Sequence, residues 1–234
     1  MGEVVLNFKR PEKGLIDEFR KIATPTVCEC MGGSGNVRFY MSSAIKPVFK
    51  GVKMVGTALT CLCHIGDNLM LQKALQLAKA GDVIVVTHGG YTEAAPWGEM
   101  MSKAAKMKGV EGLVIDGMVR DTPLLPQIGF TVFAKGAAMA GTVKNAAGLV
   151  NRPIQCGEVY VKPGDIIVGD DDGVVVVPIE RAHEVLEKSK AREKKEEETL
   201  KRVQKGELTD FMANYEKTYQ KLIESGELKE IVGP

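Results

Sequence analysis

A strand–helix–strand rhythm between residues 82 and 116 is the feature that most constrains the fold of this chain. DVIVVTHGG is a short apolar run that ends in two glycines, which is typical of a buried strand feeding a loop. PWGEMMSKAAKMKG has the pattern of a helix, and VEGLVID that of a second strand. Strands joined in this way pair in parallel through a right-handed crossover. The rhythm therefore predicts an α/β fold.

Outside this block the chain continues to alternate helical and strand patterns. Residues 13–23 carry apolar side chains at helical spacing, and Thr24-Pro25 is expected to end that helix because proline disfavours helical geometry in the residue before it. The segment after Asn68 is expected to be another helix, which Gly81 stops. Further strands are expected at 52–63 and 130–134, followed by short β runs and turns over 159–178.

The composition changes after the last of these β runs. A long, charge-dense helical pattern follows, and a second helical stretch surrounds Tyr215 and Tyr219. A chain of 234 residues suits one large domain, or one domain with an appendage. We therefore expect an α/β domain over residues 1–178 and a helical C-terminal arm over residues 179–234.

The charge of the chain is balanced, with 31 Lys and Arg residues against 30 Asp and Glu residues. Such a chain has no global field to recruit nucleic acid or an anionic membrane, so neither is expected as a partner. No apolar run reaches the roughly 18 to 20 residues that span a bilayer. Residues 1–10 lack the apolar core of a signal peptide. The expected location is therefore cytoplasmic.

Five cysteines bear on the redox setting and on metal binding. An odd number argues against a disulfide framework, and reduced thiols fit the cytosol. Cys28 and Cys30, together with Cys61 and Cys63, supply enough thiols for zinc, although structural zinc sites usually use longer Cys-x2-Cys knuckles. The other interpretation is that they are small buried hydrophobes.

Two strand ends are candidate positions for a functional site, because ligands of α/β sheets collect beyond the carboxyl ends of the strands. If the two strands of the central block are neighbours, their loops open at one edge of the sheet. The first loop enters a helix at Gly98, which lets a ligand approach the backbone. The free amides of Glu99, Met100 and Met101 favour an anion there. An ordinary capped helix is the other interpretation of this loop by itself.

Arg120 and Asp121 follow the second strand, in DGMVRD. A guanidinium binds a carboxylate through two parallel hydrogen bonds, so Arg120 completes an anion pocket if it faces the helix amides. Asp121, expected to point elsewhere, suits a hard divalent cation, with Glu99 as a second carboxylate ligand. Mg2+ tolerates such a site because it keeps several of its waters. The alternative is a surface Arg–Asp pair worth about 0 to 1 kcal/mol.

These residues belong to a longer block with a recognisable pattern. GEMMSKAAKMKGVEGLVIDGMVRD, which ends in D-G-x2-R-D, resembles a signature block of the RraA-like family. GTALTCLCHIGDNLMLQKALQLAKAGDVIVV and VKPGDIIVGDDDGVVVVP are similar to two other segments of that family, so the resemblance covers roughly residues 15–200. The family contains the class II 4-hydroxy-4-methyl-2-oxoglutarate/4-carboxy-4-hydroxy-2-oxoadipate aldolases and the regulators of ribonuclease E activity.

The resemblance implies a phosphohistidine-domain-like α/β/β sandwich, assembled as trimers that pair into hexamers in the aldolases. It also implies that Arg120 and the amides after Gly98 hold the pyruvyl carboxylate of a 2-oxo acid substrate. By the same resemblance, Asp121 holds Mg2+ or Mn2+, directly or through water, and the metal stabilises the pyruvate enolate left when the C3–C4 bond breaks. The implied enzyme is a metal-dependent aldolase that also decarboxylates oxaloacetate.

Two further residues enter through the resemblance. The aldolases carry a glutamate on a C-terminal helix that reaches a neighbouring subunit's site, and Glu196 looks like its match. Asn68, in GDN, is expected to help orient the substrate. The regulator branch tends to lack such an arm, and it supplies the alternative function: a non-catalytic protein that binds a ribonuclease or another protein partner. Glu99 is aspartate in the best-known aldolases, which leaves the physiological substrate open.

The remaining conspicuous residues have structural interpretations. Met100, Met101 and Met107 are expected to be core contacts. Trp97 either shapes the site or packs its loop. The run DDDG between two β patterns predicts a hairpin turn rather than a calcium site.

Overall fold

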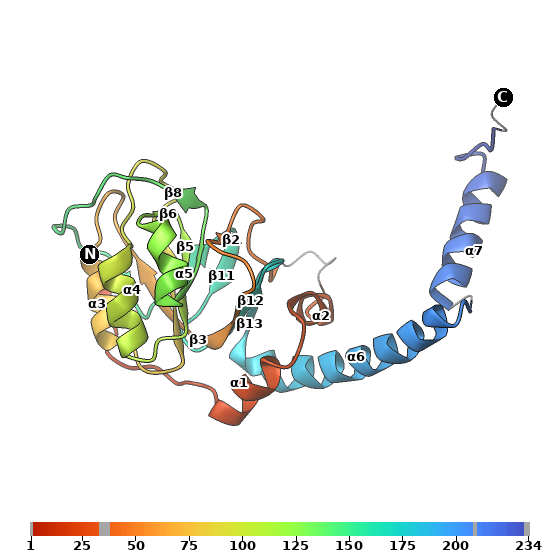
Figure 1. Cartoon of the computed structure of the whole chain (residues 1–234), viewed down its shortest axis with the longest axis horizontal. Helices are drawn as coiled ribbons and strands as arrows, with labels where there is room; N and C mark the ends of the chain where they lie inside the picture. The colour runs from red at the N-terminus through yellow and green to blue at the C-terminus, as the bar shows by residue number, and fades with distance from the viewer. Residues whose placement is uncertain (1, 33–37, 208–209, 232–234) are drawn as a thin grey trace. The chain divides into compact units, whose positions relative to one another are not determined.

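The computed structural model describes residues 2–32, 38–207 and 210–231, without the side chains of 210–212 (Figure 1). The outermost ends of the two predicted domains, residues 1 and 232–234, lie outside the described residues. The chain divides into two compact units, Met1–Ser189 and Lys190–Pro234. Within the described residues, no helix combines the length and the apolar character needed to cross a membrane.

The first unit is built on a sheet to which nine of the described strands belong. These strands are β1 (Glu3–Val4), β2 (Lys46–Pro47), β3 (Lys53–Leu62), β4 (Asp82–Thr87), β5 (Gly112–Asp116), β7 (Thr131–Ala134), β9 (Leu149–Val150), β12 (Ile166–Asp170) and β13 (Gly173–Val177). Their order is β1-β9-β3-β4-β5-β7-β2, and the antiparallel β12–β13 hairpin joins through β3. The central strands β3, β4, β5 and β7 are parallel, as the strand–helix–strand rhythm predicts.

Helices and small strand pairs surround this sheet. The helices are α1 (Lys13–Phe19), α2 (Thr24–Cys30), α3 (Leu69–Leu77), α4 (Glu99–Met107), α5 (Leu125–Ile128), α6 (Ala182–Gln204) and α7 (Asp210–Glu224), with short 3-10 turns η1 (Thr122–Leu124) and η2 (Ile179–Arg181). The small pairs are β6 (Met118–Val119) with β8 (Gly136–Ala137), and β10 (Ile154–Cys156) with β11 (Val159–Val161). The turn predicted from DDDG lies between β12 and β13.

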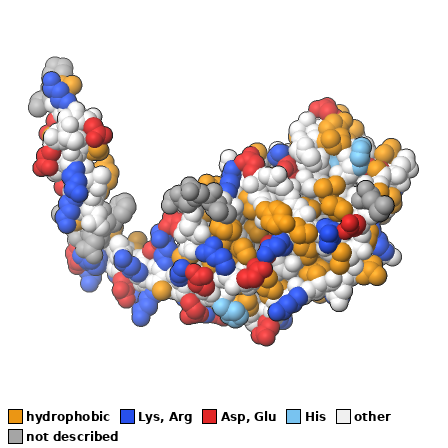
Figure 2. Space-filling model, turned by 180° about the vertical axis from the view of Figure 1, so that it is seen from behind, with side chains coloured by type: hydrophobic (Ala, Val, Ile, Leu, Met, Phe, Trp, Pro, Cys, Tyr) orange, Lys and Arg blue, Asp and Glu red, His pale blue; other side chains and the backbone are white. Residues whose placement is uncertain are grey.

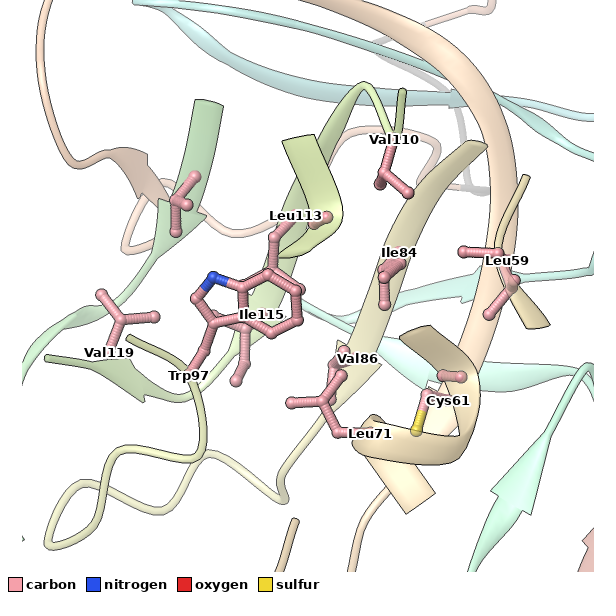
Figure 3. Close-up of a cluster of buried hydrophobic side chains, with 14 of the residues drawn as sticks. Leu59, Cys61, Leu71, Ile84, Val86, Trp97, Val110, Leu113, Ile115 and Val119 are labelled. Carbon is pink, nitrogen blue, oxygen red and sulfur yellow. The ribbon is translucent and has the colours of Figure 1, made fainter. Parts of the chain in front are cut away.

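Helices α3, α4 and α5 cover one face of the sheet (Figure 1). The strands supply alternate side chains to this layer, such as Ile84 and Val86 of β4 and Leu113 and Ile115 of β5. Trp97 lies beside the two β5 side chains (Figure 3). Burying each aliphatic side chain stabilises the fold by about 1.5–3 kcal/mol relative to leaving it exposed. This layer therefore fixes the loop that carries the tryptophan.

The opposite face of the sheet carries a second β layer. Val83 and Val85 of β4 and Val114 of β5 pack there against residues of β10, β11, β12 and β13. Helices α1 and α2 and the first turns of α6 cover the outer side of this layer, where Phe19 and Val185 are buried. The unit is thus a layered α/β/β sandwich, which confirms the predicted fold class.

Two predicted helix boundaries are wrong. Thr24-Pro25 begins α2, because a proline in the first helical turn has no amide that needs an intrahelical partner. Helix α3 ends at Leu77, since Ala78 already has an extended backbone. Gly81, with φ +82°, therefore lies in the turn into β4 rather than at the helix end.

The two Cys-x-Cys pairs lie in different clusters. Cys61 and Cys63 are buried in the helical layer, with their Sγ atoms 3.7 Å apart. Cys28 and Cys30 lie on α2 and pack against the second β layer. Burial raises the pKa of Cys61 and of Cys28, which favours the neutral thiol. In the part of the chain that is described, no three His, Cys, Asp or Glu side chains gather as metal ligands.

The second unit contains the remainder of α6 and all of α7. Ion pairs between side chains four residues apart line α6, such as Glu197 with Lys201 at 2.7 Å. Each such pair stabilises a helix by about 0.2–0.5 kcal/mol. Figure 2 shows acidic and basic side chains interspersed on the face in view, in keeping with the balanced charge of the chain.

Candidate active site

The carboxyl ends of β4 and β5 meet at one edge of the sheet, as the sequence predicts. Thr87 and Asp116, the last residues of these parallel strands, lie opposite each other in register. The loops beyond this edge help to enclose a cavity of about 380 Å³. The predicted site residues of the first unit all line this cavity: Asn68, Gly98, Glu99, Met100, Met101, Arg120 and Asp121.

Gly98 is the N-cap residue of α4, and close packing requires a glycine there. Its backbone is extended, with φ −163°, so conformation alone would admit any residue. A Cβ atom at this position would lie 2.5 Å from Asp121 Oδ2 and 2.9 Å from Arg120 Cγ. The absence of a side chain therefore lets both charged residues pack against the start of the helix.

The first turn of α4 presents backbone amides to the cavity. The amide of Glu99 donates a hydrogen bond of 3.0 Å to Asp121 Oδ2, so the prediction that this amide is free is wrong. The amides of Met100 and Met101 have no partner among the described residues. Unpaired amides at a helix N-terminus favour an anion, and these two remain for a ligand.

Backbone contacts fix the chain around Arg120. Its amide donates to the Trp97 carbonyl at 2.9 Å, and Trp97 forms an isolated parallel bridge with Val119. The Trp97 indole donates to Ser102 Oγ at 2.7 Å, and that hydroxyl donates to the Gly98 carbonyl. Trp97 is 1% exposed and also lines the cavity. It therefore does both things that the sequence left open: it packs the loop and shapes the site.

Arg120 and Asp121 face the same cavity. Adjacent residues of a strand point to opposite faces, but β6 ends at Val119, and Asp121 adopts a left-handed backbone with φ 57°. The expectation that Asp121 points elsewhere is therefore wrong, and its Oδ2 lies 3.7 Å from Arg120 Nε. The two side chains are 49% and 37% exposed, so solvent screening keeps the pair within about 0–1 kcal/mol of stability.

Asp121 and Glu99 are the acidic residues lining this cavity that could hold a hard divalent cation. Asp121 Oδ2 accepts a hydrogen bond from the Glu99 amide, whereas no described residue donates a hydrogen bond to its Oδ1. The Glu99 side chain lines the same cavity, with its Oε1 2.5 Å from Lys103 Nζ. Mg2+ is commonly bound through only one or two protein carboxylates and keeps several of its waters, for which an open cavity leaves room.

Asn68 precedes α3 and is only 7% exposed. Its Nδ2 donates to the Pro96 carbonyl at 2.9 Å, and its Oδ1 accepts a longer hydrogen bond of 3.4 Å from Gln72. These bonds join α3 to the loop before α4. Asn68 thus holds two walls of the cavity together, and its expected part in orienting the substrate remains a prediction.

Asp67 is a structural residue of the site that no sequence expectation named. Its carboxylate accepts hydrogen bonds from the amides of Leu69, Asn145 and Ala146. Burial acts to raise the pKa of Asp67, but the three amides outweigh it and hold that pKa below its ordinary value. The ionised side chain therefore ties the loop after β8 to the start of α3. The sequence signal that could have identified Asp67 is its position just before a helical run, where aspartate often accepts hydrogen bonds from backbone amides.

His88, the residue after β4, is fully buried. Its Nε2 accepts a hydrogen bond of 3.0 Å from the Gly66 amide. Burial lowers the pKa of His88, which favours the neutral ring with its proton on Nδ1. No described residue is a partner of Nδ1. His88 therefore anchors the segment that leads into Asn68.

The methionines of α4 differ from the prediction. Met101 packs against the core as expected, but Met100 and Met107 are 78% and 89% exposed. Helix α4 buries Ser102 and Ala105, whereas the two exposed methionines are seven residues apart and share another face. Met100 remains a predicted contact of the substrate through its backbone amide.

Glu196 belongs to the second unit, on α6. Its Oε1 lies 2.7 Å from Arg192 Nε, in an exposed pair of residues four positions apart. The role in a neighbouring subunit that the resemblance implies for Glu196 remains a prediction.

Comparisons with known proteins show the family of this chain. A family model described as RraA-like, Aldolase/RraA, matches residues 24–176. A relative from Halalkalibacterium halodurans, named "Putative 4-hydroxy-4-methyl-2-oxoglutarate aldolase", is 37% identical over 186 residues, which cover 80% of this chain and 87% of the relative.

Solved structures show the same fold. An uncharacterized protein from Pseudomonas syringae has a TM-score of 0.75 and 26% identity, over 86% of this chain and 97% of that one. Streptomyces coelicolor RraAS2, described as an unusual member of the RNase ES inhibitor RraA protein family, has a TM-score of 0.75 and 28% identity. That match covers 82% of this chain and 98% of the other.

Proposed function

We propose that this chain, which belongs to the RraA-like family, is a carbon–carbon lyase that releases pyruvate from a 4-hydroxy-2-oxo diacid or triacid such as 4-hydroxy-4-methyl-2-oxoglutarate. The observation that carries the proposal is that Arg120, Asp121 and the first turn of α4 meet at one cavity. The name of the H. halodurans relative supports the same reaction. Decarboxylation of oxaloacetate belongs to the proposal, because it also leaves the enolate of pyruvate.

The substrate's C1 carboxylate is bound by Arg120 in this proposal. The guanidinium offers two parallel hydrogen bonds, and the unpaired amides of Met100 and Met101 add donors and the positive end of the helix dipole. Gly98 leaves room for these groups to approach one another. Together they orient the C2 carbonyl toward the carboxylate of Asp121.

Asp121 and Glu99 hold a divalent cation, Mg2+ or Mn2+, in the proposed enzyme. When bound, the cation polarises the C2 carbonyl and stabilises the negative charge that develops on its oxygen. The Glu99 amide fixes one oxygen of Asp121, so the other can be directed at the ligand without rearrangement. Lys103 orients the Glu99 carboxylate through their contact.

Cleavage removes the proton of the C4 hydroxyl and later returns a proton to C3. As the C3–C4 bond breaks, its electron pair moves to the C2 carbonyl, and a new carbonyl forms at C4. The resemblance places a glutamate of the C-terminal helix, matched by Glu196, at the site of a neighbouring copy, and we assign this acid–base work to it. Assembly as a trimer or a hexamer is therefore part of the proposal.

A second candidate function is binding and inhibition of a ribonuclease without catalysis. The description of S. coelicolor RraAS2 favours it, because that protein shares the fold at a TM-score of 0.75. The two candidates make opposite demands on the cavity, since an inhibitor that acts through its surface needs neither Arg120 nor Asp121.

Pyruvate release tests the proposal. Lactate dehydrogenase and NADH report pyruvate formed from 4-hydroxy-4-methyl-2-oxoglutarate or oxaloacetate, with Mg2+, with EDTA, and with Mg2+ restored. We expect metal-dependent turnover that Arg120→Ala and Asp121→Ala abolish and that the distant control Lys9→Gln retains. Turnover unaffected by both alanine variants would exclude the assigned site, and no turnover with either substrate would favour the regulator.

A further inference from the structure

Lys144 is a second cationic residue at the cavity wall, besides Arg120. It is exposed, and no described acidic side chain forms an ion pair with it. The other lysine close to the start of α4, Lys103, differs because Glu99 neutralises it. Lys144 thus offers the cavity a positive charge that no acidic side chain of the described residues pairs with.

The loop that carries Lys144 runs beside the guanidinium of Arg120. A Cβ atom on Gly141 would lie 3.3 Å from Arg120 Nη1, so this loop passes close to the proposed site of the C1 carboxylate. Three residues further along the chain, a span of at most about 10 Å, the lysine lines the same cavity. Thr142, between them, adds a hydroxyl to that wall. Arg120 and Lys144 therefore line one cavity, which a ligand with two carboxylates can enter.

Asp67 holds this loop in place. Its carboxylate accepts the amides of Asn145 and Ala146, directly after the lysine. On the other side of the lysine, Val143 and the segment 66–68 exchange backbone hydrogen bonds of 3.0 Å. The Lys144 backbone is therefore fixed on both sides, although its side chain is exposed, and a fixed backbone reduces the entropy lost when a ligand binds.

We propose that Lys144 is a specificity-determining residue that binds the second carboxylate of the substrate, and that Asp67 is the residue that positions it. The inference rests on the proposed function and adds to it the selection of diacids over monoacids. Arg120 holds the carboxylate next to the reacting carbonyl, and Lys144 holds the one at the far end of the carbon chain. A monoacid such as pyruvate uses the first of these contacts only.

Binding of two unreactive ligands tests this inference without turnover. Pyruvate carries one carboxylate, whereas 2-oxoglutarate carries two and lacks the C4 hydroxyl needed for cleavage. In isothermal titration calorimetry with Mg2+ present, we expect Lys144→Gln to raise the Kd of 2-oxoglutarate by about 10- to 100-fold, as for loss of a charged hydrogen bond. The Kd of pyruvate should stay within about twofold, since that ligand never meets the lysine.

Matched variants separate this effect from general damage. Lys144→Arg keeps the charge and should restore much of the affinity for 2-oxoglutarate. Lys9→Gln removes a charge elsewhere and should leave the Kd of both ligands unchanged. Asp67→Asn should raise the Kd of 2-oxoglutarate more than the Kd of pyruvate. Equal losses for both ligands in Lys144→Gln, or no loss for either, would overturn the inference while leaving the proposed function intact. A wild-type protein that binds neither ligand would refute both.

Discussion

Asp121 Oδ2 accepts a hydrogen bond of 3.0 Å from the backbone amide of Glu99, 22 positions earlier in the chain. This contact joins the end of the β5–β6 segment to the start of α4, so the first turn of α4 and the Arg120–Asp121 pair form one unit. The carboxylate is held by a fixed backbone donor rather than by a mobile side chain. Such preorganisation means that small displacements at this contact should have large effects on activity.

Replacing Gly98 with alanine should disrupt this contact. The added Cβ would lie 2.5 Å from Asp121 Oδ2, so Asp121 and Arg120 must both move. We expect kcat for pyruvate release to fall by about 100-fold or more, because a shift of about 1 Å in a catalytic group costs on that order. Gly14→Ala is the control, since nothing lies within 4 Å of its new Cβ, and full activity of Gly98→Ala would contradict this account.

Glu196 and Arg120 should act from different copies of the chain. Each of Glu196→Gln and Arg120→Ala should be inactive alone, because the first lacks the proposed acid–base group and the second lacks the carboxylate anchor. Unfolding the two variants together and refolding the mixture should recover turnover in the mixed assemblies, where one intact site can form between subunits. A refolded mixture as inactive as the two separate variants would contradict the assignment of Glu196 to the site.

His88 should stabilise the protein through the hydrogen bond that it accepts from the Gly66 amide. His88→Leu leaves this donor without its acceptor, so the free energy of unfolding in urea should fall by about 1–3 kcal/mol. The exposed His183→Leu should change it by less than about 0.5 kcal/mol. Burial holds the pKa of His88 below 6.5, so this contribution is present above pH 6.5 and is lost as pH falls. Equal stability of both variants at pH 7.5 would contradict the assignment.

Asp165 should give the opposite pH dependence. Burial raises the pKa of this carboxyl from 3.8 to about 6. The hydrogen bonds that it accepts from the amides of Lys162 and Ile179 act to lower that pKa, but burial outweighs them. A carboxyl with a raised folded-state pKa contributes stability below pH 3.8 and loses it as pH rises through about 6. The stability of the wild type relative to Asp165→Asn should fall by on the order of 2 kcal/mol between pH 4 and pH 7. A difference that does not vary with pH would refute this.

Local patterns predicted the central sheet well, because each strand is buried on both faces and is therefore apolar throughout. The segments that became β3, β4, β5 and β7 needed no knowledge of their partners to be assigned as strands. The start of α2 was not predictable in this way. Thr24-Pro25 disfavours the preceding helix and equally suits the first turn of the next, and only the packing of α2 on the second β layer decides between these.

The candidate site was predictable only where it is encoded locally. Arg120 and Asp121 stand together in the sequence, and Gly98 marks a helix start. The contact between Asp121 and the Glu99 amide depends on the left-handed backbone of Asp121, which no spacing rule reveals. Lys144 comes from a loop without periodic pattern, so only its approach to the cavity in three dimensions connects it to the site.

Exchange of the methyl protons of pyruvate in D2O tests the central claim most directly, because it requires formation of the enolate and no cleavage of a carbon–carbon bond. Proton NMR follows the loss of the methyl signal with the wild type and with Arg120→Ala and Asp121→Ala, each with Mg2+ or with EDTA. We predict exchange by the wild type with Mg2+, none with EDTA, and none by either variant. Exchange that persists in EDTA and in both variants, or a wild type that catalyses none, would contradict the account.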